Sequence, residues 1–388
     1  MGPVQFRMPA SPNYDVFCRV VDHFGDAGIC WRLARQLARE HSLPVTLWID
    51  DCAVLARIAP ELDPEYDHQM HGSVRVRRLT KSLPADAPPA DVVIEGFGCG
   101  LPESYLAAMA ARTRAPVWIN LEYLSAEAWI EASHGLPSLH PRLPLKRWFF
   151  FPGFTEQTAG LLRERDLLAT RDAALPAANL SAPSPDNASR SAAALIVSLF
   201  CYPNSALPAL FDAWSEGDER IVCNIPEGAA RSELDFWLGG NVPHLGTSVE
   251  RGRLTLVVHA FAAQNAYDRR LWSSDLNFVR GEDSFVRAQW AARPFVWHIY
   301  PQADAAHDAK LDAFLARYTT GLDDLAATAV LEFWHAFNAG DGTATAAKWL
   351  ALRESLPALR THGRNWASAL AQQTDLVTRL VSFAASRL

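Results

Sequence analysis

The sequence lacks the features that would indicate a metal site, a disulfide framework or a membrane span. Its 388 residues include six cysteines, but none lies in a C-x-x-C pair or at zinc-binding spacing with histidine. Several lie in apolar runs, as reduced thiols buried among hydrophobic side chains do. This usage favours a reducing, cytoplasmic compartment. No run is long enough to cross a bilayer and the first fifteen residues hold no apolar stretch, so we expect neither a membrane partner nor a signal peptide.

An excess of positive charge and the common cofactor motifs are missing as well. Lys and Arg number 36 against 43 Asp and Glu, for a net charge of −7, which argues against a general nucleic-acid binder. There is no G-x-G-x-x-G fingerprint, Walker A loop, H-E-x-x-H motif or EF-hand loop. Asp50-Asp51 follows a strand-like run, but a short helix at 52–58 makes a helix cap the better explanation. We expect no catalytic metal and no cofactor.

Alternating strand-like and helical segments fill both halves of the chain. The length predicts two domains, because one hydrophobic core seldom serves so many residues. Apolar runs separated by helical segments predict parallel sheets covered on both faces. We expect strands at 14–21, 45–49, 74–79, 91–96, 117–121, 194–200, 220–224, 254–259, 275–279 and 295–299, and helices at 28–40, 322–337, 344–354 and 366–388. A stretch rich in Pro, Ser, Ala and Asn at 171–191 predicts a linker.

The turn after the first strand carries two carboxylates, Asp22 and Asp26, with glycines at 25 and 28. Open α/β sheets bind ligands at this position, outside the carboxyl ends of their strands. Asp26 can cap the following helix, with Asp22 shaping the turn. Alternatively, one carboxylate serves as a general base or orients a nucleophile. The glycines would let the backbone approach a ligand closely or adopt positive φ.

The segment Arg280-Gly281-Glu282-Asp283-Ser284 has the same strand–turn–helix setting in the second half. One interpretation is a helix start capped by Ser284 or Asp283. The other is a diphosphate cradle, in which helix N–H groups and Arg280 bind phosphate oxygens. Glu282 would then accept hydrogen bonds from sugar hydroxyls.

Aromatic side chains cluster at other strand ends of the second half. They are Phe200, Tyr202, Phe261 and Tyr267, with Gln264 beside them. Such residues usually belong to the core, but here a nucleobase could stack on them while Gln264 reads its edge. On the first helix, Arg32, Arg35 and Arg39 form a stripe that is better explained as a solvated face than as a contact for an acidic partner.

Long blocks at 17–37 and 277–290 resemble the bacterial protein-arginine rhamnosyltransferases that modify elongation factor P, the EarP family. Shorter matches to the same pattern are Phe200/Tyr202, Leu121-Glu122-Tyr123-Leu124-Ser125 and Tyr300-Pro301-Gln302. The resemblance implies a GT-B glycosyltransferase fold, in which two Rossmann-like domains face each other across a cleft. It implies an acceptor-side domain at 1–170, the linker at 171–191, a donor domain at 192–360, and a C-terminal helix at 361–388 that returns to the first domain.

The resemblance also implies an inverting, metal-independent enzyme that moves L-rhamnose from dTDP-β-L-rhamnose to an arginine of elongation factor P. Asp26 would be the base, Asp22 would support it, and Glu282 would act at the sugar. The implied donor-binding residues are Phe200, Tyr202, Phe261, Gln264, Tyr267, Arg280, Glu282, Asp283 and Ser284. The family pattern has Phe where this chain has Tyr267, and often Asn at His23. Two alternatives stay open: a nucleotide-sugar transferase acting on a small molecule or lipid, and a nucleotide-binding interaction module without chemistry.

Overall fold

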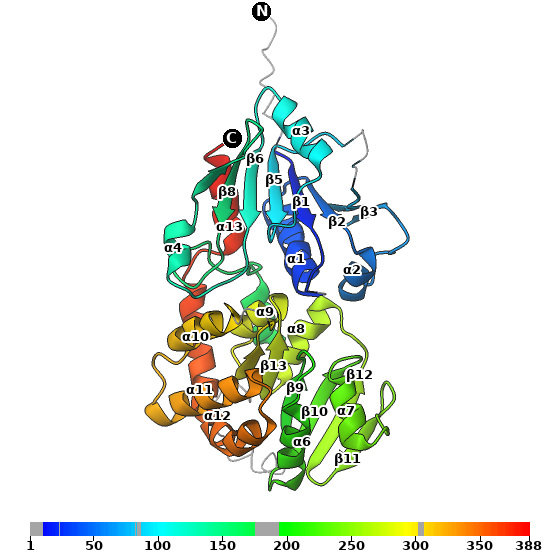
Figure 1. The fold of residues 1–388 in the computed structure, drawn as a ribbon, viewed down its shortest axis with the longest axis vertical. Coiled ribbons are helices and arrows are strands. Elements are labelled where there is room, and N and C mark those ends of the chain that lie inside the picture. The colour runs from blue at the N-terminus through cyan, green and yellow to red at the C-terminus, as the bar shows by residue number, and fades with distance from the viewer. Residues whose placement is uncertain (1–10, 23, 82, 84–86, 175–193, 302–305) are drawn as a thin grey trace, which may run out of the picture.

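The computed structural model describes residues 11–22, 24–81, 83, 87–174, 194–301 and 306–388. They form two sheet-based halves stacked along the long axis of the molecule (Figure 1). The predicted α/β class with two largely parallel sheets is confirmed. His23 and the greater part of the predicted linker, 175–193, lie outside the described residues.

In the described part of the N-terminal half, eight strands form one sheet in the order β3-β4-β2-β1-β5-β6-β8-β7. Its strands are β1 (Tyr14–Cys18), β2 (Val45–Ile49), β3 (His68–His71), β4 (Val74–Arg78), β5 (Val92–Gly96), β6 (Val117–Leu121), β7 (Pro137–Leu139) and β8 (Lys146–Phe150). The inner strands run parallel, and β3 and β7 add antiparallel edges. Four of them, β1, β2, β5 and β6, are buried along their whole length, as expected for strands covered on both faces.

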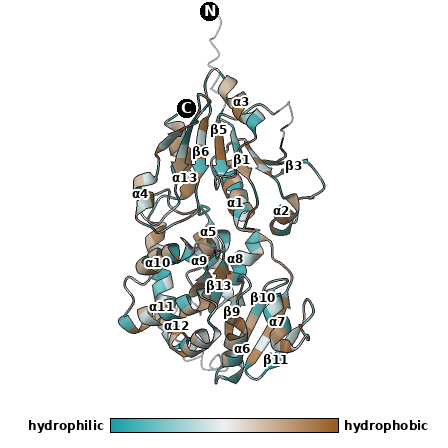
Figure 2. Ribbon diagram, in the orientation of Figure 1, coloured by the Kyte–Doolittle hydropathy of each residue, from teal (hydrophilic) through white to brown (hydrophobic). Residues whose placement is uncertain are grey.

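The C-terminal sheet has the order β11-β12-β10-β9-β13-β14 among the described residues. Its strands are β9 (Leu195–Leu199), β10 (Ile221–Pro226), β11 (Ser248–Arg251), β12 (Leu254–His259), β13 (Leu276–Arg280) and β14 (Phe295–His298). All neighbours pair in parallel except β11, which is an antiparallel edge. Hydrophobic residues concentrate on the strands inside each half (Figure 2).

Helices cover both sheets. They are α1 (Phe24–Glu40), α2 (Cys52–Ile58), α3 (Glu103–Ala111), α4 (Trp129–Ser133), α5 (Leu167–Ala174), α6 (Leu207–Glu216), α7 (Arg231–Leu238), α8 (Gln264–Ser273), α9 (Asp283–Ala291), α10 (Ala306–Tyr318), α11 (Asp324–Asn338), α12 (Gly342–Ala371) and α13 (Leu376–Ala385). Asp51 caps α2 by accepting a hydrogen bond from the Val54 N–H, as predicted. No helix among the described residues is both long and apolar enough to cross a membrane.

The last helix, α13, lies on the N-terminal sheet, whereas α10 and α11 lie in the C-terminal half (Figure 1). The Phe383 ring of α13 packs edge-on against Trp148 and Phe150 of β8. The Leu376 N–H, at the start of α13, donates to the Leu161 carbonyl. The C-terminal segment therefore ties the two halves together.

The helix boundaries predicted near the C-terminus are wrong. The structure has one continuous helix, α12, where the sequence predicted a helix ending at 354 and another starting at 366. It also has a break at 372–375 where one helix was predicted to run to 388. The predicted domain boundary at 360 falls inside α12, and the predicted linker begins inside α5. The domain limits themselves stay predictions.

Each sheet has a switch point where the strand order reverses direction. It lies between β1 and β5 in the N-terminal sheet and between β9 and β13 in the C-terminal sheet. Ligands of open α/β sheets bind outside the carboxyl ends of the strands at such points. The Tyr202 hydroxyl, just after β9, donates to the carboxylate of Asp22, just after β1. The two switch points therefore face each other across the junction of the halves.

Candidate active site

The site residues predicted from the sequence lie beyond the carboxyl ends of strands in the two sheets. Asp22 follows β1, and Asp26 lies in the first turn of α1. Phe200 and Tyr202 follow β9, and the segment from Arg280 to Ser284 joins β13 to α9. Phe261, Gln264 and Tyr267 follow β12. Residues 240 or more positions apart in the sequence thus meet in one region.

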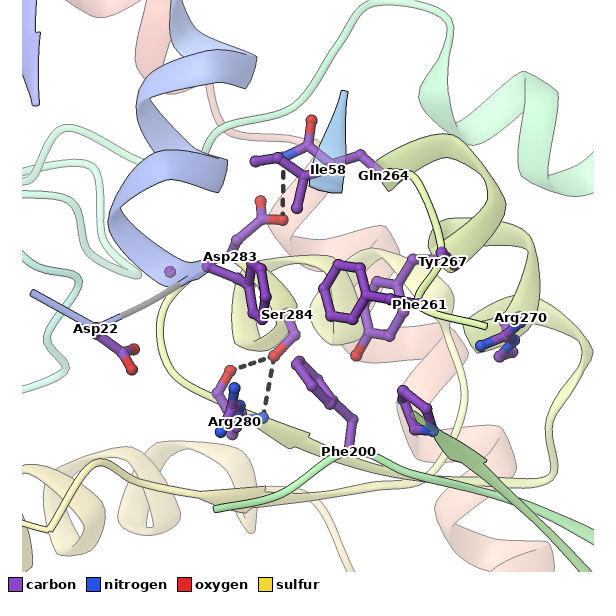
Figure 3. A pocket seen from close by; sticks show the side chains of 14 residues that line it. Asp22, Ile58, Phe200, Phe261, Gln264, Tyr267, Arg270, Arg280, Asp283 and Ser284 are labelled. Carbon is purple, nitrogen blue, oxygen red and sulfur yellow. Dashed lines mark hydrogen bonds between the residues drawn. The ribbon is translucent and has the colours of Figure 1, made fainter. Parts of the chain in front are cut away.

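Three aromatic rings surround a pocket in the C-terminal half (Figure 3). The Phe200 ring centroid lies 6.2 Å from that of Phe261 and 5.8 Å from that of Tyr267, edge-to-face in both pairs. Arg270 lies on one side of these rings and Asp22 on the opposite side (Figure 3). An opening edged by aromatic rings suits a planar group such as a nucleobase. The lining residues are Asp22, Phe24, Gly25, Ile58, Phe200, Pro226, Phe261, Ala262, Gln264, Tyr267, Arg270, Arg280, Asp283 and Ser284.

The N-terminal half covers one side of this pocket, which the sequence did not indicate. The Phe24 ring, at the start of α1, lies 4.2 Å from the Phe261 ring, centroid to centroid. The Arg57 guanidinium of α2 lies 4.8 Å from the Phe261 ring and 5.5 Å from the Phe24 ring. Phe24 stood in the block that carried the resemblance, whereas nothing in the sequence singled out Ile58 or Arg270 as site residues.

Gln264 is buried and holds an unsatisfied acceptor. Its amide nitrogen donates to the Gly28 carbonyl at 3.0 Å and to the Asp283 carboxylate at 3.3 Å. Its carbonyl oxygen is buried without a hydrogen-bond partner in the described part of the chain. Buried polar atoms are nearly always paired, so this oxygen is available to a donor group on a ligand.

Ser284 does not cap α9, and neither does Asp283. The Ser284 hydroxyl instead contacts the preceding strand end, accepting from the Arg280 N–H at 3.0 Å and donating to the Arg280 carbonyl. Glu282 occupies the N-cap position without a side-chain cap bond. The capping interpretation is therefore wrong, and the first turn of α9 keeps N–H groups that can bind an anion.

Arg280 and Gly281 shape the approach to this helix start. The Arg280 guanidinium lies over the rings of Phe200 and Tyr202, at 4.5 and 4.7 Å from their centroids. Gly281 has φ of +58°, and a Cβ there would meet the Asp22 carboxylate and lie 3.0 Å from the Tyr202 hydroxyl oxygen. Only glycine meets both requirements at low cost. It lets the turn at 280–282 approach the acidic turn of the other half.

Asp283 belongs to a buried group of charges that spans the two halves. Its carboxylate accepts from Arg32 Nε at 2.8 Å, and Arg32 also binds Asp268 at 3.0 Å and Glu164 at 3.4 Å. Arg287 completes the group, with Asp268 at 2.7 Å and Glu164 at 2.6 Å. We name these five residues the interdomain charge network. Although burial opposes its ionisation, Arg287 and Arg32 lower the pKa of Glu164 to about 2.

The arginine stripe of α1 is therefore not a solvated face. The Arg32 side chain is 1% exposed, because α8 and α9 of the other half cover it, while Arg39 is exposed as predicted. The glycines of this helix also serve the contact between halves. A Cβ on Gly28 would lie 2.9 Å from the Asp283 Cβ, so glycine allows α1 and α9 to approach closely.

Asp26 is fully buried and accepts three hydrogen bonds. Its Oδ2 accepts from the backbone N–H groups of Val21 at 2.8 Å and Asp22 at 2.9 Å. Its Oδ1 accepts from the Tyr123 hydroxyl at 3.0 Å. These N–H groups precede the helix, so Asp26 is not a cap for the N–H groups of the first turn of α1.

Two more carboxylates complete an acidic cluster, which we define as Asp22, Asp26 and Glu282. Asp22 accepts from the Tyr202 hydroxyl at 2.8 Å, and Glu282 accepts from the Leu124 N–H of the other half. The pKa of Glu282 is raised to about 7, mainly by burial and also by Asp26 and Asp22, although Lys310 and the Leu124 N–H act to lower it. Among the described residues, no group of three or more His, Cys, Asp or Glu side chains is arranged to hold a metal ion.

Comparison with known proteins places this geometry in a family. The family model described as "Elongation-Factor P (EF-P) rhamnosyltransferase EarP" matches residues 14–385. A protein-arginine rhamnosyltransferase of Pseudomonas putida is 46% identical over 374 residues, which cover 96% of this chain and 98% of that protein.

Solved structures agree with this result. One described as "Structural basis for EarP-mediated arginine glycosylation of translation elongation factor EF-P" has a TM-score of 0.66 and 34% identity, over 97% of this chain and 100% of that chain. An α-glucosyltransferase solved with UDP and DNA has a TM-score of 0.52 at 8% identity, over 97% of this chain and all of the other. It shows the fold alone. The predicted GT-B glycosyltransferase architecture is confirmed.

Proposed function

Because this chain belongs to the EarP family of elongation factor P rhamnosyltransferases, we propose that it transfers L-rhamnose from dTDP-β-L-rhamnose to an arginine of elongation factor P, with inversion at the sugar. The observation that carries the proposal is the acidic cluster, since its three carboxylates, two from the N-terminal half and one from the C-terminal half, lie at the junction beside the aromatic pocket. The relatives' described activity supports the same acceptor chemistry.

The donor nucleotide binds the C-terminal half in this account. The thymine ring stacks among Phe200, Phe261 and Tyr267, and its N3–H donates to the unpaired carbonyl oxygen of Gln264. The diphosphate lies at the start of α9, where N–H groups and the Arg280 guanidinium can neutralise it. The sugar then extends towards the acidic cluster.

The reaction is a single displacement at the anomeric carbon. A guanidinium is protonated at neutral pH and is not nucleophilic. As a guanidine nitrogen forms its bond to C1, that nitrogen gives a proton to Asp26, and the bond from C1 to the diphosphate oxygen breaks. The departing electron pair stays on dTDP, so the product is a rhamnosylated, still cationic arginine with α configuration. The proton on Asp26 passes to solvent when the products leave.

The other members of the cluster support this step. Asp22 holds the turn that carries Asp26 and adds negative charge beside the cationic acceptor. Glu282 accepts from the sugar hydroxyls once the donor displaces its present contact with the Leu124 N–H. Because Arg280 and the α9 N–H groups can stabilise an activated diphosphate leaving group, we propose that no metal participates. The acceptor is a translation factor, so we propose a cytoplasmic location.

Intact mass spectrometry of elongation factor P tests the proposal. Incubation with the enzyme and dTDP-rhamnose should add the mass of one deoxyhexose, and incubation with UDP-glucose should add none. An arginine-to-lysine variant of the acceptor serves as the control. If the donor binds but the mass of elongation factor P stays unchanged, transfer to a small molecule or lipid becomes the better account. If the donor is neither hydrolysed nor transferred, the chain is a binding module.

A further inference from the structure

The hydroxyl of Tyr123 lies at the centre of the acidic cluster. It donates to Asp26 Oδ1 at 3.0 Å. Burial raises the pKa of the Tyr123 phenol, and the charges of Asp26, Glu282 and Asp22 raise it further. The phenol therefore stays protonated throughout the working pH range, and it donates its single hydroxyl proton in the hydrogen bond to Asp26.

Each carboxylate of the cluster has its own hydrogen-bond donor. Asp26 has Tyr123, Asp22 has Tyr202, and Glu282 has the Leu124 N–H. Two tyrosines, one from each half of the molecule, thus hold the two aspartates. Tyr123 and Leu124 are neighbours after β6, so one short segment of the N-terminal half contacts a carboxylate on each side of the junction.

The contacts of Asp26 with the described residues leave one position for an incoming proton. A carboxylate accepts about four hydrogen bonds, two on each oxygen. Both positions of Oδ2 are taken by the N–H groups of Val21 and Asp22, and Tyr123 takes one position of Oδ1. The position that no described residue occupies is on Oδ1. The hydroxyl of Tyr123 therefore binds the oxygen that can receive the acceptor proton.

The Tyr123 ring is itself held in place. It stacks on Phe97 with centroids 4.3 Å apart and planes 12° apart. Phe97 has φ of +57°, a left-handed conformation that is uncommon for a bulky residue. Its N–H donates to the Leu121 carbonyl at 2.7 Å. Backbone strain of this kind persists where the surroundings enforce it, and often at functional sites.

We propose that Tyr123 is a positioning residue for the base, which holds Oδ1 of Asp26 in the direction of the acceptor. This inference rests on the proposed function. Loss of the hydroxyl removes the contact that Oδ1 makes in the described part of the chain, while the two backbone N–H groups still hold Oδ2. Tyr123→Phe removes the hydroxyl and keeps the ring on Phe97.

The test is the kinetics of rhamnosyl transfer by the full-length Tyr123→Phe enzyme. We expect kcat to fall roughly ten- to a hundredfold, as for the loss of a hydrogen bond to a charged group. The KM for elongation factor P should stay close to its wild-type value, because Tyr123 acts on the base and not on acceptor binding. The Kd of dTDP-rhamnose and the melting temperature should match those of the wild type, because the ring and its packing remain.

Tyr202→Phe provides the matched comparison, since it removes the equivalent hydroxyl from Asp22. It should lower kcat by a smaller factor, because Asp22 only supports the base. An unchanged kcat in Tyr123→Phe would overturn the inference, as would equal losses of kcat in both variants or a loss that appears only in KM. Absence of transfer by the wild-type enzyme would instead reject the proposed function. The two failures are therefore distinguishable.

Discussion

The two switch points of the molecule occupy the same place in their sheets but carry different chemistry. The N-terminal one holds Asp22 and Asp26, whose oxygens are bound by backbone N–H groups and tyrosine hydroxyls. The C-terminal one holds aromatic rings, the Arg280 guanidinium and a helix start without a side-chain cap. One suits a cationic nucleophile, and the other suits a planar base and an anionic leaving group. In both sheets the switch point is the place where a ligand can bind. The residues that follow its strands determine which chemical group can bind there.

Contacts between the two halves hold the two switch points in position relative to each other. Arg32 of α1 extends into the other half to reach Asp283 and Asp268, and Glu282 reaches back to the Leu124 N–H. Residues of the two halves are thereby held in a fixed arrangement at the junction. The predictions below separate the contributions of the acidic side, the contact and the aromatic side.

The largest effect is expected from Asp26→Asn. Loss of a general base typically costs about 10²- to 10⁴-fold in rate. The asparagine oxygen can still accept from Val21 and Asp22, and its amide can donate to the Tyr123 oxygen, so folding and donor affinity should persist. Turnover is measured by intact mass, with Asp22→Asn as the matched variant and a smaller expected loss. Retained turnover in Asp26→Asn would remove it from the role of base.

Breaking the interdomain charge network should give the next largest effect. Arg32→Met leaves Asp283 buried without its cation, and such a change typically costs about 3–5 kcal/mol of stability. Chemical unfolding of the variant measures this cost. Arg39→Met, on the exposed side of the same helix, is the control and should unfold like the wild type. Equal stability of both variants would mean that the network does not hold the halves together.

On the aromatic side, Phe200→Leu should weaken donor binding and leave the chemical step intact. Stacking of a base on an aromatic ring is worth about 1–3 kcal/mol, so the Kd of dTDP-rhamnose should rise by roughly five- to a hundredfold. Calorimetric titration provides the Kd. Phe236→Leu alters a ring that is 78% exposed in the same half and should not change affinity. An unchanged Kd in Phe200→Leu would place the base elsewhere.

The smallest effect concerns the pH dependence of stability at Glu282. Its pKa is raised from 4.5 to about 7 by burial, so the folded state binds a proton more tightly than the unfolded state. This group's stabilisation is present below pH 4.5 and is lost as the pH rises through 7. Glu282→Gln removes that dependence while keeping an acceptor for the Leu124 N–H. The wild type should therefore lose melting temperature relative to the variant over this window; parallel curves would contradict the assignment.

The buried strands could be predicted accurately from the sequence, whereas the edge strands of the sheets could not. Val45–Ile49 and Val117–Leu121 were predicted to the residue, because strands buried on both faces are continuous apolar runs. Edge strands such as β3 and β11 are short and largely exposed, so they give no such signal. The sequence predicted separate helices at 344–354 and 366–388, but α12 continues through Pro357 and Gly363. A Cβ on Gly363 would lie 3.3 Å from the backbone of Ala292, so that glycine reflects packing and not a helix end.

The predicted site residues lie together in the structure, but their contacts could not be predicted. The carboxylates at strand ends could be predicted because parallel sheets bind ligands there. Helix-face reasoning could not reveal that Arg32 is buried, since Asp268 and Asp283, which bind it from the other half, lie more than 230 positions away. For the same reason the covering role of Phe24 and the contact between Tyr123 and Asp26 could not be predicted from local sequence.

The most direct test compares single-turnover transfer to elongation factor P by Asp26→Asn and Phe200→Leu at saturating dTDP-rhamnose. If the acidic side supplies the base and the aromatic side only binds the nucleotide, Asp26→Asn should be nearly inactive and Phe200→Leu should transfer at close to the wild-type rate. Equal losses of the transfer rate in the two variants at saturating donor would contradict the assignment of the base to one switch point and of nucleotide binding to the other.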